Sequence, residues 1–525
     1  QLTAALSTLI VSLFYLIQQM VGAGALVKPL LGLDHHWGVI IVGVIVIFIV
    51  ATAGMTSTTY VQFIKGGLLI VFSTILAVHI FNNGLNLNPD HERQKYHDFI
   101  TLTPTIDNGN VVEAGGGYEV IAQKDIEGNT FVKLQKDGVY RWFQLDQEDG
   151  QPVLIEMLSI TDTGDETLYN GAPKDSAKFF QVGHLSKIIV DGKEVDKTGP
   201  IGPFKFLSTI ESSTVVRFVK ERFEDGKNTV NVYYQKPTDG KKMMTPGLKF
   251  KIGEGTNFWE KLNFISLMIA LFFGTSALPH ILIRYYTVPS PKAARKSTIV
   301  AIAAIGGFYV LTLFMGLGAS VNGVLDVESS NMSGPLLAKA FGIGLFSIIS
   351  AIAFATILGT VSGLIVASSG AIAHDFIDRF LKKNLSDKSR VMAGRLAAGS
   401  VGLVAIVLGI IFEGMNVSFL VGWAFAVAAS ANLPAILMLL FWKKTTAKGI
   451  AWSIIIGIIA ALGIILTSPS MFAQYGYEKS EALHNLDNPA IISFTLAMLT
   501  LIFVSLATQK DNVNKKSMQQ LEDGE

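Results

Sequence analysis

Hydroxyl side chains and glycines share one face of an apolar stretch, AFATILGTVSGL, at residues 353–364. Their three- and four-residue spacing places on one side of a helix the positions Thr356, Gly359, Thr360 and Gly363. Ser362 lies nearby on a different side. Hydroxyls and main-chain carbonyls are the ligands that a hard monovalent cation needs where carboxylates are absent. The alternative is that these hydroxyls simply donate to the carbonyl one turn earlier, as is usual in transmembrane helices.

A second candidate site surrounds a proline in the stretch GTSALPHILIRYY, residues 274–286. Pro279 removes a backbone hydrogen bond from a helix, and Thr275 lies one turn before it. Carbonyls freed at such breaks line substrate or ion sites in transporters. His280 follows the proline; a lone histidine in a helix is more often structural than a proton carrier, and both interpretations stay open.

A third candidate site lies in the stretch YLIQQMVGAG, residues 15–24, where three polar side chains interrupt an apolar helix. These are Tyr15, Gln18 and Gln19. Amides inside a membrane must find partners in the protein or in a hydrated cavity. The sequence therefore predicts that this helix faces a polar site.

Carboxylates are absent from the middle of every apolar span, so a carboxylate proton relay is not visible. Lys65 is the charged exception, in the cytoplasmic half of its predicted span. We expect its long side chain to extend towards the inner membrane interface.

The elements that position these residues follow from composition. The chain has 525 residues, of which 50% are hydrophobic and 16% charged, and its mean hydropathy is +0.45. About 20 apolar residues cross a bilayer, which predicts ten spans in an all-α polytopic membrane protein. They lie at 3–30, 38–54, 57–82, 260–282, 297–322, 343–372, 391–412, 416–441, 449–468 and 490–508.

Charge is unevenly distributed, although the formal net charge is only +1. Residues 83–259 carry a net charge of −5 and the remainder +6, so the chain is not strongly basic anywhere and a nucleic-acid partner is excluded. Basic residues concentrate in the loops 283–296, 373–390 and 442–448 and in the C-terminal tail. Because cytoplasmic loops carry the excess of Lys and Arg, residues 83–259 are predicted to lie outside.

The polar insert at 83–259 alternates short β-type runs with turns that contain glycine. The runs are TFVKLQ, YRWFQL, SKIIV, TVVRFVKERF and TVNVYYQ, and the turns centre on Gly128, Gly138, Gly150, Gly192, Gly226 and Gly240. Turn chemistry explains the Asp-Gly steps better than Ca²⁺ loops. The chain has no cysteine, which excludes thiolate sites and disulfides, and the scattered His91, His97 and His184 form no catalytic motif.

Five segments, taken together and in order, resemble the sodium:solute symporter family. They are YLIQQMVGAG, TTYVQFIK (58–65), LPHILIRYYTVPSPKAARKS (278–297), AFATILGTVSGL and VGWAFAVAASANLP (421–434). The acetate permease branch is the most similar, and the insert resembles a large-insert bacterial subfamily. In that subfamily a small membrane protein encoded nearby is a possible partner subunit.

The resemblance implies a thirteen-helix protein with an inverted-repeat, 5+5, LeuT-like core, of which this chain holds helices four to thirteen and is N-terminally truncated. The implied domains are transmembrane helices at 1–82 (helices four to six), an extracytoplasmic insert at 83–259, transmembrane helices at 260–508 (helices seven to thirteen) and a cytoplasmic tail at 509–525.

The resemblance also implies roles for the candidate residues. Thr356 would offer its carbonyl and Thr360 its hydroxyl to Na⁺, while Gly359 replaces a serine common in the family and Ser362 lies nearby. The implied substrate site takes in Tyr15, Gln18, Gln19, Thr275, Pro279 and His280. Na⁺ is favoured over H⁺ as coupling ion, because the middle of each span lacks carboxylates.

The function that follows is Na⁺-coupled symport of a small organic anion such as acetate by alternating access, in the bacterial plasma (inner) membrane. No other cofactor and no enzymatic activity is expected. The alternative is a membrane-anchored sensor, or a subunit of a transporter complex, that acts through its extracytoplasmic domain.

Overall fold

The computed structural model divides the chain into two compact units. The first comprises Gln1–Phe72, Pro246–Tyr309 and Ser347–Glu525, and the second comprises Ser73–Thr245 and Val310–Phe346. The residues described are 2–52, 56–89, 96–126, 128–148, 150–173, 179–245, 252–253, 255–282, 285, 288–373, 377 and 386–509. All but the first residue of the tail expected at 509–525, and most of the basic loop at 373–390, therefore lie outside the described residues.

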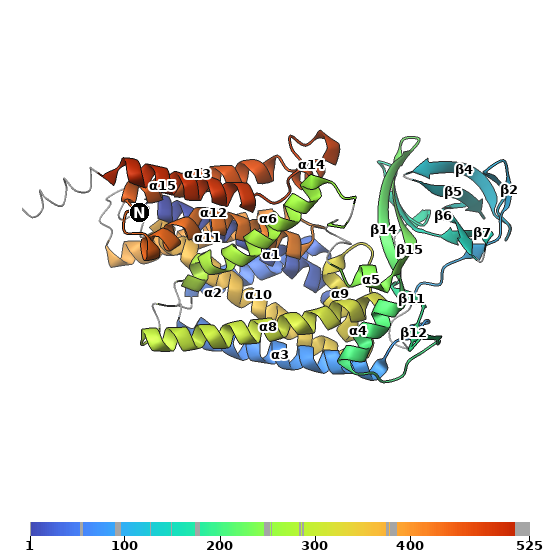
Figure 1. Cartoon of the computed structure of the whole chain (residues 1–525), viewed down its shortest axis with the longest axis horizontal. Helices are drawn as coiled ribbons and strands as arrows, with labels where there is room; N and C mark the ends of the chain where they lie inside the picture. Colours follow the sequence, from blue (N-terminus) through green and yellow to red (C-terminus); the bar gives the residue numbers. More distant parts are fainter. Residues whose placement is uncertain are drawn as a thin grey trace, which may run out of the picture. The chain divides into compact units, whose positions relative to one another are not determined.

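Helices make up the first unit, and three of them continue into the second (Figure 1). They are α1 (Leu2–Leu31), α2 (His35–Thr52), α3 (Thr56–Asn83), α6 (Phe258–Gly274), α7 (Pro279–Leu282), α8 (Pro291–Val321), α10 (Ile343–Gly370), α11 (Asp387–Ile411), α12 (Val417–Phe441), α13 (Ala447–Leu466), α14 (Pro469–Gln474) and α15 (Ala490–Ala507). Short 3-10 turns, η2 (Thr275–Ala277) and η6 (Lys479–Glu481), complete the unit.

Within the described residues, nine helices are long and apolar enough to cross a membrane. The tenth expected span, α2, is apolar over His35–Ala51 and is shorter than the rest. Hydropathy predicts these helices well because every backbone polar group in lipid must be bonded within its own helix.

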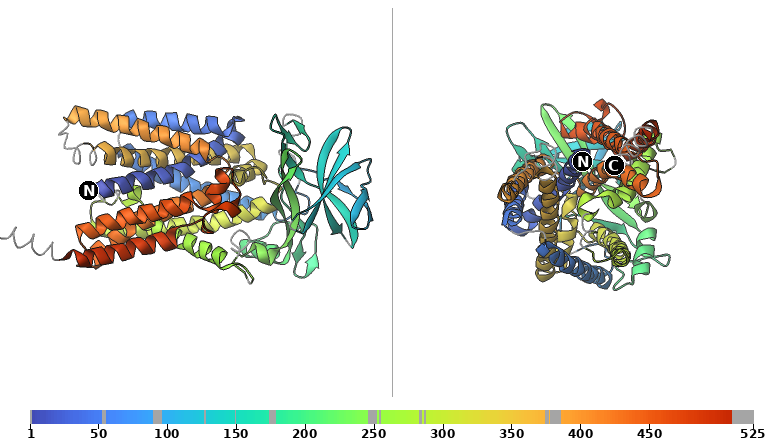
Figure 2. Two further views of the ribbon diagram at one scale, coloured as in Figure 1. Left: turned by 90° about the horizontal axis from the view of Figure 1, so that it is seen from above. Right: turned by 90° about the vertical axis from the view of Figure 1, so that its left-hand side faces the viewer.

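Small residues let the helices of the first unit, seen from two further sides in Figure 2, pack closely, and α12 contacts α1, α6, α13 and α15. A side chain added at Gly274 would meet the main-chain oxygen of Phe425 at 2.4 Å, and one at Gly457 would meet that of Ser430 at 2.2 Å. Close backbone approach of this kind drives helix association in lipid. It also fixes where α6 meets α12, beside the candidate site.

The second unit contains two antiparallel sheets that combine hairpin-paired strands with strands distant in sequence. Their orders are β1-β7-β6-β5-β4 and β10-β9-β8-β15-β14-β11, with two separate pairs, β2-β3 and β12-β13. The strands are β1 (Thr101–Leu102), β2 (Thr105–Asp107), β3 (Asn110–Glu113), β4 (Glu119–Ile126), β5 (Asn129–Lys136), β6 (Val139–Glu148), β7 (Gln151–Glu156), β8 (Leu158–Asp162), β9 (Thr167–Tyr169), β10 (Ala172–Pro173), β11 (His184–Lys187), β12 (Ile189–Val190), β13 (Lys193–Glu194), β14 (Thr214–Asp225) and β15 (Asn228–Asp239).

The glycine turns form hairpins at most of the predicted positions that the structure describes. Asp137 and Asp191 adopt φ of 51° ahead of Gly138 and Gly192, as a two-residue turn with both residues left-handed requires. Residues 127 and 149, which open two other predicted turns, lie outside the described part. The turn predicted at Gly240 is wrong, because the Asp239 side chain instead accepts from the backbone N–H of Lys241 and caps helix α5 (Gly240–Met243).

The core of the second unit lies between the sheets and extends to the segment that follows α8. Phe131 and Trp142 of one sheet pack with Val230, Val232 and Tyr234 of the other. The same unit also contains helix α4 (Pro203–Ser212), helix α9 (Ser333–Phe341) and the 3-10 turn η4 (Ser330–Met332). The segment that follows α8 pairs with Val182, which lies just before β11, in an isolated bridge of two backbone hydrogen bonds between Val182 and Leu325, of 2.9 and 2.8 Å.

Candidate functional site

The helix that carries the predicted break does break. Helix α6 ends at Gly274, a 3-10 turn follows, and Leu278 is extended with φ −74° and ψ 120° before α7 begins at Pro279. The residue before a proline is driven out of the helical region because the ring clashes with its backbone. The interruption leaves main-chain groups of this segment without helical partners.

Asn432 of α12 supplies a partner at that interruption. Its side-chain Nδ2 donates to the carbonyl of Ala277 at 2.9 Å, and its Oδ1 accepts from the Ser7 hydroxyl of α1. Ala277 is fully buried, so its carbonyl depends on a donor from the protein. Sequence reasoning missed Asn432; the available signal was an amide within an apolar helix, two residues before Pro434.

Three aromatic rings converge beside the break. The Tyr15 ring of α1 lies 4.9 Å from the His280 ring of α7 and stacks on Phe425 of α12 at 5.9 Å, measured between ring centroids. Tyr15 and His280, both predicted site residues, are therefore neighbours. The structure joins the first and second candidate clusters of the sequence into one location.

Gln18 occupies the next turn of the Tyr15 face of α1. It is 1% exposed, and neither Oε1 nor Nε2 has a hydrogen-bond partner among the described residues. A buried amide without partners costs about 1–3 kcal/mol. Such a group is suited to bonding a polar ligand that enters from the Tyr15 side.

The remaining predicted substrate residues are less central. Thr275 is exposed, and its hydroxyl donates to the carbonyl of Leu271 in the last turn of α6 at 2.7 Å. Gln19 is half-buried and follows Gln18 on α1. Pro279 contributes to the site only by causing the helix break. The structure thus brings Tyr15 and His280 together and leaves Thr275 outside that pair.

The candidate cation residues all lie on α10, and their hydroxyls are bonded to carbonyls one turn earlier. Thr356 donates to Ile352 at 2.8 Å, Thr360 to Thr356 at 3.0 Å, and Ser362 to Leu358 at 2.6 Å. This is the ordinary behaviour of hydroxyls in apolar helices. A hydroxyl that donates keeps its lone pairs, so Thr356 and Thr360 can still coordinate a cation, whereas buried Ser362 faces another side.

The Lys65 side chain reaches α10. Its Nζ donates to the main-chain carbonyl of Ala355. The ammonium therefore lies one residue from Thr356.

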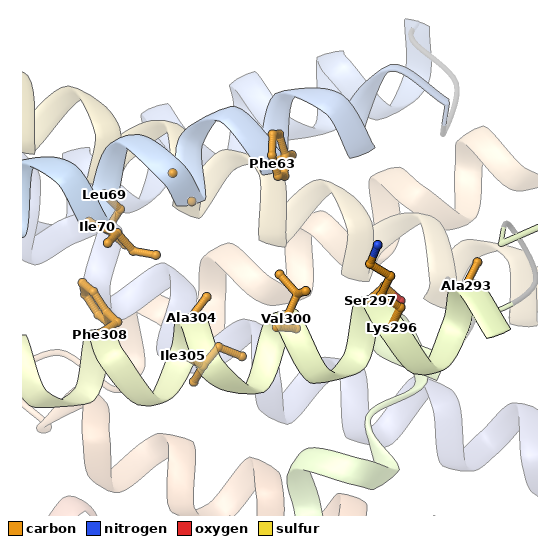
Figure 3. A pocket seen from close by; sticks show the side chains of 13 residues that line it. Phe63, Leu69, Ile70, Ala293, Lys296, Ser297, Val300, Ala304, Ile305 and Phe308 are labelled. Carbon is orange, nitrogen blue, oxygen red and sulfur yellow. The ribbon is translucent and has the colours of Figure 1, made fainter. Parts of the chain in front are cut away.

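A cavity of about 750 Å³ separates α3 from α8. Figure 3 shows Phe63 of α3 across from Val300 of α8, and Ile70 of α3 across from Phe308 of α8. The lining of the cavity is apolar except for Lys296 and Ser297 at one end, and it contains none of the predicted site residues. The cavity is therefore ill suited to bind a small anion along most of its length.

The insert holds buried charges that serve its own fold. Glu156 is 1% exposed and accepts from Arg141 Nη1 at 2.8 Å and from the backbone N–H of Ile100 at 3.1 Å. Burial lowers the pKa of His184 to about 4, and its Nδ1 bonds the Tyr96 hydroxyl. Among the described residues, no three His, Asp or Glu side chains cluster as a metal site would require.

Sequence comparison decides the family. The profile of the Sodium:solute symporter family matches residues 1–106 and 226–457. The chain belongs to the sodium:solute symporter family. This symporter is 31% identical over 506 residues to the uncharacterized symporter YwcA of Bacillus subtilis, and the match covers 94% of this chain and 70% of that protein. It is 30% identical over 528 residues to the monocarboxylic acid transporter of Corynebacterium glutamicum, covering 98% and 72%.

Family membership identifies the apolar helices as membrane-spanning helices. The symporter is a multi-pass membrane protein of a transporter family, and its apolar helices are membrane spans. The break beside Tyr15 and the hydroxyl face of α10 therefore lie within spans, where irregular backbone occurs only if it is covered by protein or lines a cavity.

Proposed function

We propose that the protein is a Na⁺-coupled symporter of a small monocarboxylate such as acetate. The observation that carries this proposal is the match, along nearly the whole chain, to a monocarboxylic acid transporter. The family assignment supports symport, and the hydroxyl face of α10 supports a monovalent cation as the coupled ion. The proposal includes a 5+5 inverted-repeat, LeuT-like core that works by alternating access.

The Tyr15–His280 location is the proposed substrate site. A small carboxylate can accept from the Tyr15 hydroxyl, the Gln18 amide and backbone groups near the break. Phe425 and the buried alanines of α12 bound the same space, which favours a small solute over a bulky one. Asn432 holds the break in place and is a positioning residue.

The proposal places the protein in a bacterial inner membrane, with residues 83–259 outside and the C-terminus in the cytoplasm. The distribution of Lys and Arg among the loops supports this orientation. A small membrane subunit encoded nearby is the proposed partner, and co-purification from native membranes tests it.

Uptake of radiolabelled acetate into vesicles that contain the full-length protein tests the proposed function. We expect uptake above that of protein-free vesicles, and stimulation by an inward Na⁺ gradient. Uptake that ignores the Na⁺ gradient contradicts the coupling, and absence of acetate uptake contradicts the substrate. Competition by unlabelled propionate and pyruvate then defines the range of monocarboxylates.

A further inference from the structure

Lys65 places a charge in an apolar helix, and no described residue supplies it with a counter-ion. It forms no ion pair with a described residue, and the ion pairs of the described part all lie between residues 97 and 225. The only carboxylate within the described membrane spans is Glu260, in the first turn of α6. A charged side chain inside a membrane is expensive and is usually retained for function.

The Lys65 ammonium reaches the same turn of α10 that carries the candidate cation ligands. It donates to the Ala355 carbonyl, directly before Thr356. Two carbonyls of this turn also accept side-chain hydroxyls, Ile352 from Thr356 and Thr356 from Thr360. This turn therefore concentrates oxygen atoms, and the Lys65 ammonium already donates to one of them.

We propose that Lys65 is a tethered cation that competes with the coupling cation for the oxygen-lined turn of α10. When the coupling cation is absent, the ammonium satisfies the Ala355 carbonyl. When the coupling cation binds at Thr356 and Thr360, the ammonium leaves this carbonyl. Lys65 thus sets the cation affinity of the symporter, an inference that rests on the proposed cation coupling.

The size of the effect follows from electrostatics. Two like charges about 8 Å apart, at an effective dielectric constant of about 20, weaken a binding constant by roughly thirtyfold. The flexible lysine stem can withdraw the ammonium part of the way, so we expect about a tenfold effect. Removing the charge of Lys65 should strengthen Na⁺ binding. Loss of the hydrogen bond from Lys65 to Ala355 should not strengthen Na⁺ binding by itself.

The test compares Lys65→Gln and Lys65→Arg in acetate uptake by the full-length protein, across a range of Na⁺ concentrations. For Lys65→Gln we expect half-maximal activation at a Na⁺ concentration about tenfold lower than in the unmodified protein. For Lys65→Arg, which keeps the charge, we expect a value close to the unmodified one. Lys296→Gln is the matched control, because it removes an exposed lysine that lines the α3–α8 cavity.

The proposal is overturned if the Na⁺ concentration for half-maximal uptake is unchanged in Lys65→Gln, or if Lys65→Gln and Lys65→Arg change it equally. It is also overturned if uptake is independent of Na⁺ in both the unmodified protein and Lys65→Gln. If uptake is Na⁺-independent in the unmodified protein but becomes Na⁺-activated in Lys65→Gln, the tethered cation is supported and Na⁺ coupling of the natural protein fails. The two proposals can therefore fail separately.

A binding measurement covers variants that fold but do not transport. Na⁺ that binds the folded protein raises its melting temperature, and tighter binding gives a larger shift at equal Na⁺. We expect a larger Na⁺-induced shift for Lys65→Gln than for the unmodified protein, and an equal or smaller shift overturns the proposal. Lys65→Met, with a side chain of similar length, replaces the Gln variant if that variant does not fold.

Discussion

The side-chain amide of Asn432 donates to the main-chain carbonyl of Ala277 at 2.9 Å, which ties α12 to the interruption between α6 and α7. The two residues are 155 positions apart in sequence. The bond satisfies a fully buried carbonyl that the helix break would otherwise leave without a donor. Because the same Asn432 accepts from Ser7 of α1, one amide joins the three segments that surround the proposed substrate site.

Asn432→Ala should therefore impair transport more than it impairs folding. Leaving a buried carbonyl unpaired costs about 1–3 kcal/mol in the free energy of unfolding. We expect a fall in the maximal rate of acetate uptake of at least about tenfold, since a misplaced break disturbs the site geometry. Uptake kinetics and thermal unfolding measure the two effects.

Ser276→Ala is the control for this variant. Ser276 lies in the same interruption, but its hydroxyl is exposed and donates to Phe273 of its own segment. We expect near-normal uptake from it. Equal losses in Ser276→Ala and Asn432→Ala would show that the Asn432–Ala277 bond has no special part in positioning the break.

Tyr15→Phe tests the role of the Tyr15 hydroxyl separately from that of its ring. The ring packing against His280 and Phe425 is kept, so the free energy of unfolding should change by less than about 1 kcal/mol. Loss of a hydrogen bond to a charged substrate costs about 1.5–3 kcal/mol, so the KM for acetate should rise by ten- to a hundredfold. An unchanged KM would remove the Tyr15 hydroxyl from the substrate site.

Gln18→Leu should separate stability from function. The buried amide of Gln18 lacks partners among the described residues, so a leucine of similar size should raise the free energy of unfolding by about 1–3 kcal/mol. If the amide bonds the substrate, uptake falls at the same time. Ser12→Ala is the control, because Ser12 is fully buried on the same helix and its hydroxyl is also unpartnered in the described part. Its uptake should be unchanged.

Local rules predict much of this architecture. The break before Pro279 needs only the steric clash of one ring, and the turn at Gly138 needs only an Asp-Gly pair between two strands. The spans follow from the cost of unbonded backbone in lipid. Each of these features depends on residues close together in sequence, which is why the sequence alone reveals them.

Long-range partners could not be predicted. Lys65 finds the Ala355 carbonyl 290 residues away, and no property of its own helix indicates that acceptor. In the sequence, nothing separates Asn432 from other polar residues in apolar spans. Only its contact with Ala277 distinguishes it. Asp239 shows the same limit on a small scale, since an Asp-Gly pair serves equally well as a turn and as a helix cap.

His184 should make strand β11 sensitive to acid. Burial lowers its pKa to about 4, against about 6.5 for an unfolded histidine. The stabilisation is therefore complete above about pH 6.5 and is lost as the pH falls towards 4, by about 3 kcal/mol in total, because the unfolded state binds the proton first. Hydrogen exchange of the β11 amides, corrected for the intrinsic rate, should show weaker protection at pH 5 than at pH 7.

His184→Gln provides the control for this pH dependence. Glutamine can still form a hydrogen bond with the Tyr96 hydroxyl but does not titrate, so its β11 protection should be equal at both pH values. Burial raises the pKa of Tyr96 well above its usual range, so this hydroxyl stays protonated throughout. Equal protection of the β11 amides at pH 5 and pH 7 in the unmodified protein would contradict the prediction.

Thr360→Ala tests the proposed cation site. In the structure the Thr360 hydroxyl donates to the Thr356 carbonyl at 3.0 Å, so its oxygen keeps lone pairs for a cation. Removing it should raise the Na⁺ concentration for half-maximal uptake by about tenfold, the value of one lost oxygen ligand at roughly 1.4 kcal/mol. Expression and melting temperature should stay near normal, because a back-bonded hydroxyl contributes little to helix stability.

Thr495→Ala is the matched control for Thr360→Ala. Thr495 donates in the same way, to Ile491 one turn earlier at 2.6 Å, but it is exposed on α15. Its removal tests the generic loss of a threonine hydroxyl from a membrane helix, and we expect unchanged Na⁺ activation. If Thr360→Ala behaves like Thr495→Ala, the α10 hydroxyls are structural and the cation binds elsewhere; a selective loss in Thr360→Ala supports the site on α10.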